Sequence, residues 1–289
     1  MSGTLYLVAT PIGNLEDNTI RALRVLREEV NVIACEDTRQ TQKLLQEYQI
    51  HKPLVSYHEH NEASRSAEIL TRLEEGESVA LVSDAGTPLI SDPGFRIVHL
   101  AVERGIPIVP IPGPSAAMSA LVASGLATNE FRFLGFLPAR SAARRRALEG
   151  LKDDDSTLIV YESPHRIVET LAEMAEILYD RPVVLAREIT KIHEEFLRGT
   201  AAEIHDQLAA RATVKGEITL VIGPAGEAKA TGDAAAEVER LKANGLDQMQ
   251  AIKQVAKQMG LPKREVYRLA VAQDSNPPDK HRDSDRSGR

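Results

Sequence analysis

A chain of 289 residues, of which 43% are hydrophobic, is long enough to bury a sizeable core and predicts about two domains. Its one cysteine, Cys35, excludes an internal disulfide and a cysteine-rich zinc site, and its apolar surroundings favour a buried strand residue over a catalytic thiol. The net charge of −7 excludes a protein covered in positive potential, so a nucleic-acid partner would need a local basic surface.

The chain begins with an apolar run at residues 5–10 that is typical of a strand. No basic segment precedes this run, so we expect no signal peptide. No apolar run in the sequence approaches the ~18 residues of a membrane-spanning helix. These observations together predict a cytoplasmic protein.

Short β-branched runs then alternate with longer amphipathic stretches, a pattern typical of parallel α/β layers. Gly76 and Gly105 stand where two of the amphipathic stretches should end as helices. We therefore expect a doubly wound domain over residues 1–112. Its strands are expected at 5–10, 30–35, 54–57, 79–83 and 106–111, and its helices near 19–29, 41–49, 64–74 and 94–104.

A second series predicts another α/β domain over residues 113–226, with strands at 131–134, 157–161, 183–187, 195–198 and 218–222. Two such sheets in tandem create a cleft. From residue 231 the composition shifts to Ala, Glu, Lys and Gln, and Gly245 and Gly260 separate three helical stretches. Residues 231–273 are thus expected to form a helical module that resembles a helix-turn-helix, although any small helical bundle has the same spacing. Residues 274–289 are polar and predicted to be disordered.

The loops after the five strands of the first domain are expected to carry the ligand site, because parallel sheets bind ligands beyond their carboxyl ends. These loops are TPIGNLEDN, EDTRQ, HEHNE, DAGTPLISDPG and PGPSAA. Turn formation alone would explain the Gly and Pro residues of one loop, but five in succession favour a rim lined for a ligand. Neither G-x-x-x-x-G-K-[ST] nor G-x-G-x-x-G is present, which disfavours ordinary ATP or NAD binding. A ligand without phosphates, such as S-adenosylmethionine, fits better.

An ordered set of motifs runs from about residue 4 to 223: LYLVATPIGNLEDNT, ACEDTR, SYHEHNE, VALVSDAGTPLISDPGF, PIPGPSAAMSALVASGL, FLGFLP, YESPHR, AREITKIHEEFLRGT and KGEITLVIG. The set resembles the family of ribosomal RNA small subunit methyltransferases I. The resemblance implies the tetrapyrrole methylase fold, S-adenosylmethionine in a cleft between two α/β domains, and a homodimer. It also implies methylation of the ribose 2′-hydroxyl of a cytidine in the decoding centre of 16S ribosomal RNA, within the 30S subunit.

The resemblance distributes the cofactor contacts over five segments. Residues 11–14 match the first cofactor-side loop of the family, 84–88 match the loop nearest the methionine moiety, and 113–116 match the entry into the second domain. Residues 133–137 and 161–162 fall where the second domain would cover the adenine. The residues expected to bind the cofactor are Pro11, Gly13, Asn14, Asp84, Ala85, Gly86, Thr87, Pro88, Ser91, Asp92, Gly113, Ser115, Ala116, Leu134, Tyr161 and Glu162.

Methyl transfer to a ribose hydroxyl depends on positioning and is helped by a base that accepts the proton. At the end of the second strand, a carboxylate pair and a guanidinium could align a ribose or phosphate, or form an ion pair that closes the loop. A similar charged group ends a strand of the second domain. No third histidine or cysteine cluster accompanies the His58 and His60 pair, so no metal is expected. The candidate bases are Glu36, Asp37, His58, His60, Glu62, Glu188 and Lys191, with Arg39 as a positioning group.

The arginines after FLGFLP are the strongest local signal for RNA phosphates: Arg140, Arg144, Arg145 and Arg146. A solvated helix face is the competing interpretation, because the acidic run at 153–155 cancels much of their charge. The fold class leaves two other functions open. One is a small-molecule methylase that acts on a tetrapyrrole, and the other is a ligand-sensing regulator whose C-terminal module binds nucleic acid.

Overall fold

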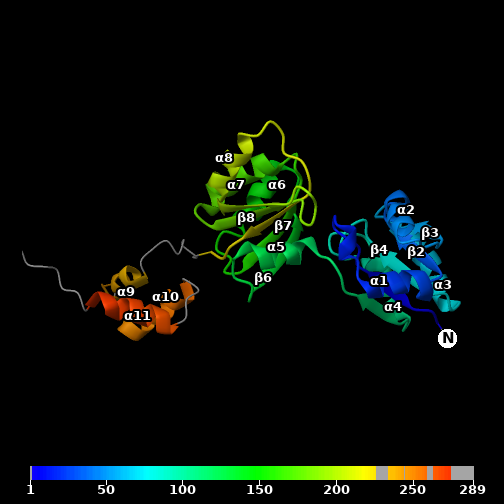
Figure 1. Cartoon of the computed structure of the whole chain (residues 1–289), viewed down its shortest axis with the longest axis horizontal. Coiled ribbons are helices and arrows are strands. Elements are labelled where there is room, and N and C mark those ends of the chain that lie inside the picture. Colours follow the sequence, from blue (N-terminus) through cyan, green and yellow to red (C-terminus); the bar gives the residue numbers. More distant parts are fainter. Residues whose placement is uncertain (1, 226–233, 244, 259–262, 275–289) are drawn as a thin grey trace, which may run out of the picture.

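A computed structural model describes residues 2–225, 234–243, 245–258 and 263–274. Two α/β units follow one another along the chain, and a helical unit comes after them (Figure 1). The prediction of a disordered tail at 274–289 lies outside the described residues, except for Asp274 at the end of the last helix. No helix among the described residues is long and apolar enough to cross a membrane.

The first sheet has five parallel strands in the order β3-β2-β4-β1-β5. They are β1 (Leu5–Val8), β2 (Val32–Cys35), β3 (Leu54–Ser56), β4 (Val79–Val82) and β5 (Ile108–Ile111). All five predicted strands are confirmed, with ends that differ by one or two residues. Every residue of β2 and β4 is buried, because helices cover both faces of a parallel sheet.

Helices cover this sheet on both faces. Apolar residues of α3 (Glu62–Glu74) and α4 (Phe95–Glu103) pack on one face. The other face is covered by α1 (Ile20–Arg24), which continues as a π-helix (Val25–Glu29), and by α2 (Thr38–Glu47). Both predicted glycine terminators adopt a positive φ, 97° at Gly76 and 63° at Gly105, which ends a helix at little cost.

The second sheet has the order β6-β7-β10-β8-β9, with β6 (Phe131–Phe136), β7 (Thr157–Glu162), β8 (Pro182–Arg187), β9 (Glu195–Thr200) and β10 (Ile218–Ile222). The five strands are confirmed, but the expectation of parallel layers is wrong here. The β6–β7 pair is parallel and the other three pairs are antiparallel. The reason is the short 188–194 connection, which cannot hold a crossover helix and makes a hairpin of β8 and β9.

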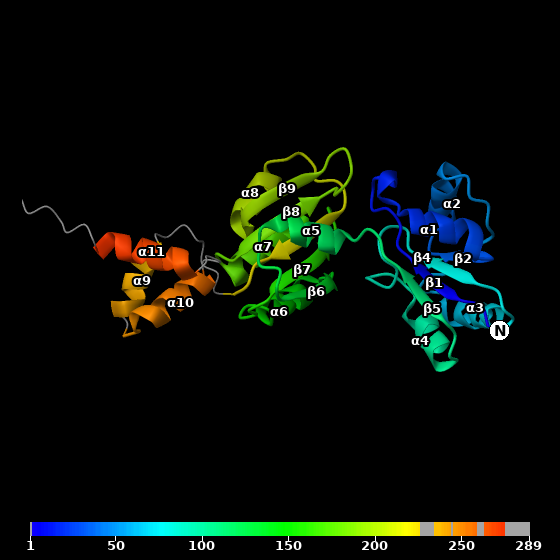
Figure 2. The same cartoon turned by 60° about the horizontal axis from the view of Figure 1, so that its bottom comes forward.

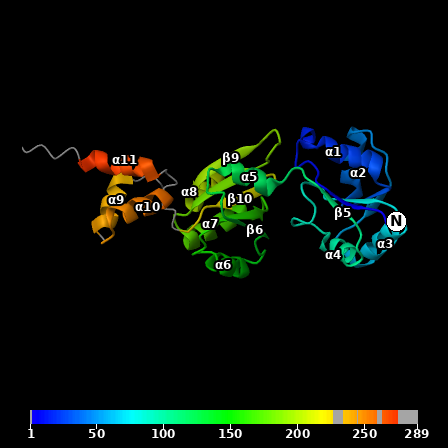
Figure 3. The ribbon, with the colours of Figure 1, turned by 90° about the horizontal axis from the view of Figure 1, so that it is seen from below.

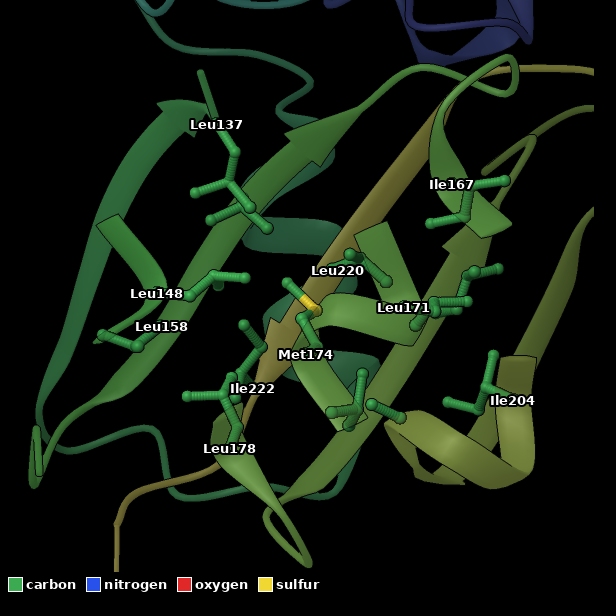
Figure 4. Close-up of a cluster of buried hydrophobic side chains, with 14 of the residues drawn as sticks. Leu137, Leu148, Leu158, Ile167, Leu171, Met174, Leu178, Ile204, Leu220 and Ile222 are labelled. Carbon is green, nitrogen blue, oxygen red and sulfur yellow. The ribbon is translucent and has the colours of Figure 1, made fainter. Parts of the chain in front are cut away.

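The core of the second unit lies between its sheet and α6 (Ser141–Glu149), α7 (Ile167–Leu178) and α8 (Ala201–Ala209). Figure 4 shows Met174 of α7 close to Leu220 of β10, within the buried cluster that also includes Leu171, Ile204 and Ile222. The opposite face is covered by α5 (Ala116–Ser124), which follows β5 in sequence but packs on the second sheet. The chain therefore crosses between the two sheets just before α5.

The helical unit consists of α9 (Ala234–Ala243), α10 (Gln248–Gln258) and α11 (Lys263–Asp274), as predicted. It is separate from both sheets in the views of Figures 2 and 3. Val238, Leu241, Ile252, Val255 and Val266 are buried where the three helices meet. The unit thus has a hydrophobic core of its own.

Candidate active site

The loops after β1 and β4 are bonded to each other at the carboxyl edge of the first sheet. Val8 pairs with Val82, so the two parallel strands deliver their following loops to the same place. The amide of Thr10 donates to the carbonyl of Gly86 at 2.9 Å, and the amide of Gly86 donates back at 3.0 Å. The Thr10 hydroxyl also donates to the carbonyl of Ser83 at 3.0 Å. These hydrogen bonds tie the two loops together at the rim.

The loop after β4 holds two ordinary residues in the left-handed region, Leu89 at φ 70° and Ser91 at φ 68°. Such conformations cost about 1–3 kcal/mol each and cluster at functional sites. The carboxylate of Glu62 helps to hold the loop, since its Oε1 accepts from the amides of Gly94 and Arg96, each at 3.2 Å. Glu62 is thus engaged at the start of α4, which argues against its predicted role as a base.

The loop after β8 meets the loop after β1 and joins the two units. The amide of Asn14 donates to the Thr190 hydroxyl at 3.1 Å. Glu188 and Thr190 adopt φ values of 53° and 69°, a second cluster of left-handed residues. The Lys191 ammonium binds the carboxylate of Glu188 at 2.8 Å and that of Glu217 at 2.9 Å. This loop is a fixed contact between the two units.

A pocket of about 390 Å³ lies between these loops, within the size range of small-molecule sites. It is bounded by the first unit, by the segment that enters α5, and by β6, β7 and β10 of the second unit. Its lining residues are Ile12, Asp84, Ala85, Gly86, Thr87, Ile90, Ser91, Asp92, Ser115, Ala116, Phe136, Tyr161, Glu162, Ser163, Pro164, Ile189, Glu217, Ile218 and Thr219.

Most of the residues predicted to bind the cofactor line this pocket. Six of the predicted residues do not: Pro11, Gly13, Asn14, Pro88, Gly113 and Leu134. Gly113 instead allows a close chain contact, since a Cβ there would lie 2.9 Å from the Cβ of Ala9. The residues of the set that do line the pocket are Asp84, Ala85, Gly86, Thr87, Ser91, Asp92, Ser115, Ala116, Tyr161 and Glu162.

Sequence reasoning missed the wall formed by Glu217, Ile218 and Thr219 at the start of β10. The rule that sites follow strand ends holds for parallel strands. Because β10 runs antiparallel to β7, Ile218 pairs with Glu162, and the beginning of β10 reaches the pocket. These three residues could have been predicted if the direction of β10 had been known. Ser163, Pro164 and Ile189 were missed as well, whereas Ile12, Ile90 and Phe136 lie in segments that were predicted to reach the ligand.

Within the described residues, the pocket carboxylates of Asp84 and Asp92 have no paired cation, whereas Glu162 and Glu217 pair with Arg166 and Lys191. Burial, together with the charges of Glu36 and Asp84, raises the pKa of Asp92 to about 6. Burial and the charge of Asp84 likewise raise the pKa of Glu36. Asp84 is positioned by the amide of Asp37, which donates to its Oδ1 at 3.0 Å. The site therefore favours a ligand that carries positive charge.

The predicted charged groups at the end of β2 have different surroundings. Asp37 caps α2 and accepts from the amide of Arg39 at 2.8 Å and from its guanidinium at 2.8 Å. These bonds lower the pKa of Asp37 to about 2, and the pair closes the loop. Glu36 is the predicted candidate that the structure places beside the pocket carboxylates. Neither Arg39 nor any of the seven candidate bases belongs to the lining of this pocket.

His58 lies in the turn after β3 and not on a continued strand. Its amide donates to Asn61 at 2.9 Å, and its ring stands edge-on to that of His60 at 5.9 Å. Within the described residues, no group of three or more His, Cys, Asp or Glu side chains is arranged to hold a metal ion.

Glu162 is buried at the edge of the pocket and saturated with donors from its own unit. Its carboxylate accepts from the amide of Ser163 at 2.7 Å, from Nε of Arg166 at 2.9 Å and from the hydroxyl of Thr170 at 2.8 Å. The neighbouring Tyr161 ring instead belongs to an aromatic group with Phe133 and Phe136. One side of the pocket thus combines the aromatic rings of Tyr161 and Phe136 with the hydrogen-bonded carboxylate of Glu162.

The arginine cluster does not form one RNA-binding surface. The Arg144 side chain is fully buried and pairs with Glu173 at 2.6 Å and with Glu169 at 3.0 Å. The prediction that Arg144 binds RNA is therefore corrected, because its donors face the interior. Arg145 pairs with Glu176 at 2.7 Å, whereas Arg140 and Arg146 are exposed.

Residues 4–205 match the family described as tetrapyrrole (corrin/porphyrin) methylases. The fold agrees. A uroporphyrin-III-C-methyltransferase from Thermus thermophilus has a TM-score of 0.54 at 22% identity, over 76% of this chain and 94% of that chain. A diphthine synthase has a TM-score of 0.59 at 14% identity, over 76% and 90%. The chain belongs to the tetrapyrrole methylase family.

Within this family the chain is similar over most of its length to relatives named ribosomal RNA small subunit methyltransferase I. It is 51% identical to the relative from Halalkalibacterium halodurans, over 92% of this chain and 94% of that one. Identity to the Bacillus subtilis relative is 46%, over 92% and 93%. For the Pseudomonas aeruginosa relative it is 45%, over 93% and 97%. The chain is therefore a member of the ribosomal RNA small subunit methyltransferase I family, and the resemblance inferred from its motifs is confirmed.

Proposed function

We propose that this protein transfers a methyl group from S-adenosylmethionine to the RNA of the small ribosomal subunit. The observation that carries the proposal is the similarity to relatives named ribosomal RNA small subunit methyltransferase I, with 45–51% sequence identity over at least 92% of the chain. Fold neighbours below 25% identity include enzymes with other substrates, so the fold alone would not select RNA.

The pocket suits this cofactor by the chemistry of its lining. S-adenosylmethionine carries a sulfonium and an ammonium, which the carboxylates of Asp84 and Asp92 would stabilise. Its adenine would lie against apolar groups such as Ile90 and Phe136. A structural neighbour from Thermus thermophilus, with a TM-score of 0.55 at 19% identity, is complexed with S-adenyl homocysteine. When bound, the cofactor supplies an electrophilic methyl carbon.

The protein's own task is to orient a ribose 2′-oxygen and to accept its proton. We assign Asp92 as the base that accepts this proton, because a carboxylate with a pKa of about 6 is a competent base near neutral pH. The charge of Glu36 contributes to this raised pKa. We propose that the methyl group is transferred to the ribose 2′-hydroxyl of a cytidine in the decoding centre of 16S ribosomal RNA.

The remaining parts of the proposal concern partners. The 30S subunit in the cytoplasm is the expected substrate, and a homodimer is the expected state. Arg140 and Arg146 keep their proposed role in phosphate binding, because both are exposed on the second unit, at the start of α6 and within it. The division into domains at 1–112, 113–226 and 231–273 also stays a proposal.

The test is to incubate purified protein with labelled S-adenosylmethionine and 30S subunits from a strain that lacks the modification. One 2′-O-methylcytidine in 16S RNA is expected. Label in a porphyrinoid substrate but none in the subunits would replace the proposal with a small-molecule methylase. Free 16S RNA, run in parallel, tells whether the assembled subunit is needed.

Calorimetry tests the cofactor site separately. Asp84→Ala removes a pocket carboxylate, and Gly86→Val forces a branched residue into a φ of 86°, so both should weaken S-adenosylmethionine binding at least about tenfold. Asp155→Ala, an exposed acid before β7, is the matched control. Equal affinities in all three variants would place the cofactor elsewhere.

A further inference from the structure

The helical unit α9–α11 presents a surface that neither its own core nor the methyl-transfer pocket uses. Its buried residues, among them Val238, Ile252 and Val266, pack only within the unit as the structure describes it. The core of the unit is therefore formed by its own three helices, and exposed side chains of α10 and α11 lie outside it.

The charge of this surface is opposite to that of the chain. The chain carries a net −7, but residues 248–274 contain five Lys or Arg and only two Asp or Glu. On α9 the basic groups are neutralised within the helix, since Arg240 binds Glu237 and Lys242 binds Glu239. On α10 and α11, Lys253, Lys263 and Arg264 are exposed and form no ion pair with another described residue. The positive charge of the unit is thus concentrated on α10 and α11.

The outward face of α11 combines charge with an aromatic ring. Arg264, Tyr267 and Arg268 stand at positions i, i+3 and i+4, so they share one side of the helix. Val266 and Ala270 are buried on the other side. The side chain of Tyr267 is 49% exposed, in a chain with only 4% aromatic residues. Guanidinium groups beside an exposed ring bind nucleic acids through phosphate contact and base stacking.

The connection between α10 and α11 has the length of a helix-turn-helix turn. α10 ends at Gln258 and α11 begins at Lys263, which leaves four residues, one of them Gly260. In such motifs the second helix is the one presented to the nucleic acid. This spacing also occurs in other small helical bundles, so the composition of the α11 face is the observation that indicates a nucleic acid.

We propose that the exposed face of α11, with Lys253 of α10, binds the phosphate backbone of the RNA substrate and raises its concentration at the pocket. This inference rests on the proposed function, because it takes the RNA to be the molecule that is methylated. Phosphate contacts of this kind add affinity without reading sequence. The surface therefore contributes to substrate binding and leaves the transfer step unchanged.

The test uses the full chain with the double substitution Lys263→Glu and Arg264→Glu. Its control is Arg240→Glu with Lys242→Glu, which makes the same change of charge on α9 of the same unit. Binding of a fluorescent 16S RNA fragment is measured by anisotropy over a range of salt concentrations, apart from turnover. Loss of two phosphate contacts should lower affinity about tenfold at moderate salt and reduce the salt slope by about 2. In methylation assays KM should rise by the same factor while kcat stays constant.

Equal RNA affinity in the α11 variant and the α9 control would overturn the inference. A loss seen only with a DNA duplex of the same sequence would also overturn it. Tyr267→Ala separates stacking from general charge, because it should weaken binding about fivefold or more without a change in the salt slope. Failure of the unaltered protein to methylate 30S subunits would instead refute the proposed function, so the two failures are distinguishable.

Discussion

Gly13, in the loop after β1, lies directly against Lys191, in the loop after β8: a Cβ on Gly13 would be 2.4 Å from Cγ of Lys191. The Lys191 ammonium holds Glu188 and Glu217, and Glu217 lines the pocket. A residue from the first unit therefore fixes the position of a pocket wall that belongs to the second unit. Gly13 was predicted to touch the cofactor, but it is not among the residues that line the pocket.

Gly13→Ala should weaken cofactor binding although the residue does not line the pocket. The added methyl group forces Lys191 to move, and overpacking of this kind costs about 1–3 kcal/mol. If the whole cost falls on cofactor binding, the affinity drops roughly fivefold to a hundredfold. Calorimetry with S-adenosylmethionine measures the change. Gly150→Ala is the matched control, because a Cβ there would meet its nearest neighbour at an ordinary 3.4 Å. If the two variants bind equally well, the contact does not support the pocket.

Arg144 and Arg146 lie two residues apart on α6, but substitution of Arg144 should lower stability, whereas substitution of Arg146 should weaken RNA binding. Arg144→Ala leaves the Glu173 carboxylate, whose side chain is 8% exposed, without its partner, which costs about 3–5 kcal/mol of stability. Arg146→Ala changes an exposed side chain and should stay within about 0.5 kcal/mol. Urea unfolding gives both values. RNA binding should weaken for Arg146→Ala alone, and the reverse pattern would restore Arg144 as an RNA contact.

The strands were predictable because buried parallel strands form short continuous apolar runs. The end of β6 was not predicted correctly, because the strand was expected to end at residue 134 and continues to Phe136. The structure shows why: Gly135 adopts a φ of 66° at an irregularity in the pairing with β7, so it bends the strand without ending it.

The candidate site was predictable where it follows strand ends and unpredictable where it depends on tertiary pairing. The acidic loop around Asp84 and Asp92 was found from its place after β4. The burial of Arg144 was missed because a run of arginines suggests an exposed surface. Helical spacing could have corrected this, since Arg144 and Leu148 are four residues apart and both face the core. The partner carboxylate on α7 could not have been inferred from α6 alone.

Glu162→Gln should destabilise the second unit more than it weakens cofactor binding. The buried carboxylate accepts from Arg166, Thr170 and the amide of Ser163, and hydrogen bonds to a charged group contribute about 1.5–3 kcal/mol each. A loss of at least ~2 kcal/mol in urea unfolding is expected, against no measurable loss for the exposed Glu149→Gln. Normal stability combined with lost cofactor affinity would mean that Glu162 contacts the ligand, as the sequence had suggested.

Asp92→Asn should stabilise the protein at neutral pH and abolish methyl transfer. The folded-state pKa of about 6 lies above the ordinary value of 3.8, so the native state retains a proton that the unfolded chain releases, and stability falls as pH rises between these values. Above pH 6 the charged carboxylate costs about 1–2 kcal/mol after an allowance for solvent screening. The variant should therefore gain this amount at pH 7.5 and nothing at pH 3.5. Urea midpoints at both pH values measure it, with Asp155→Asn as the exposed control. A gain that is the same at both pH values would show that the effect comes from packing and not from the titration of Asp92.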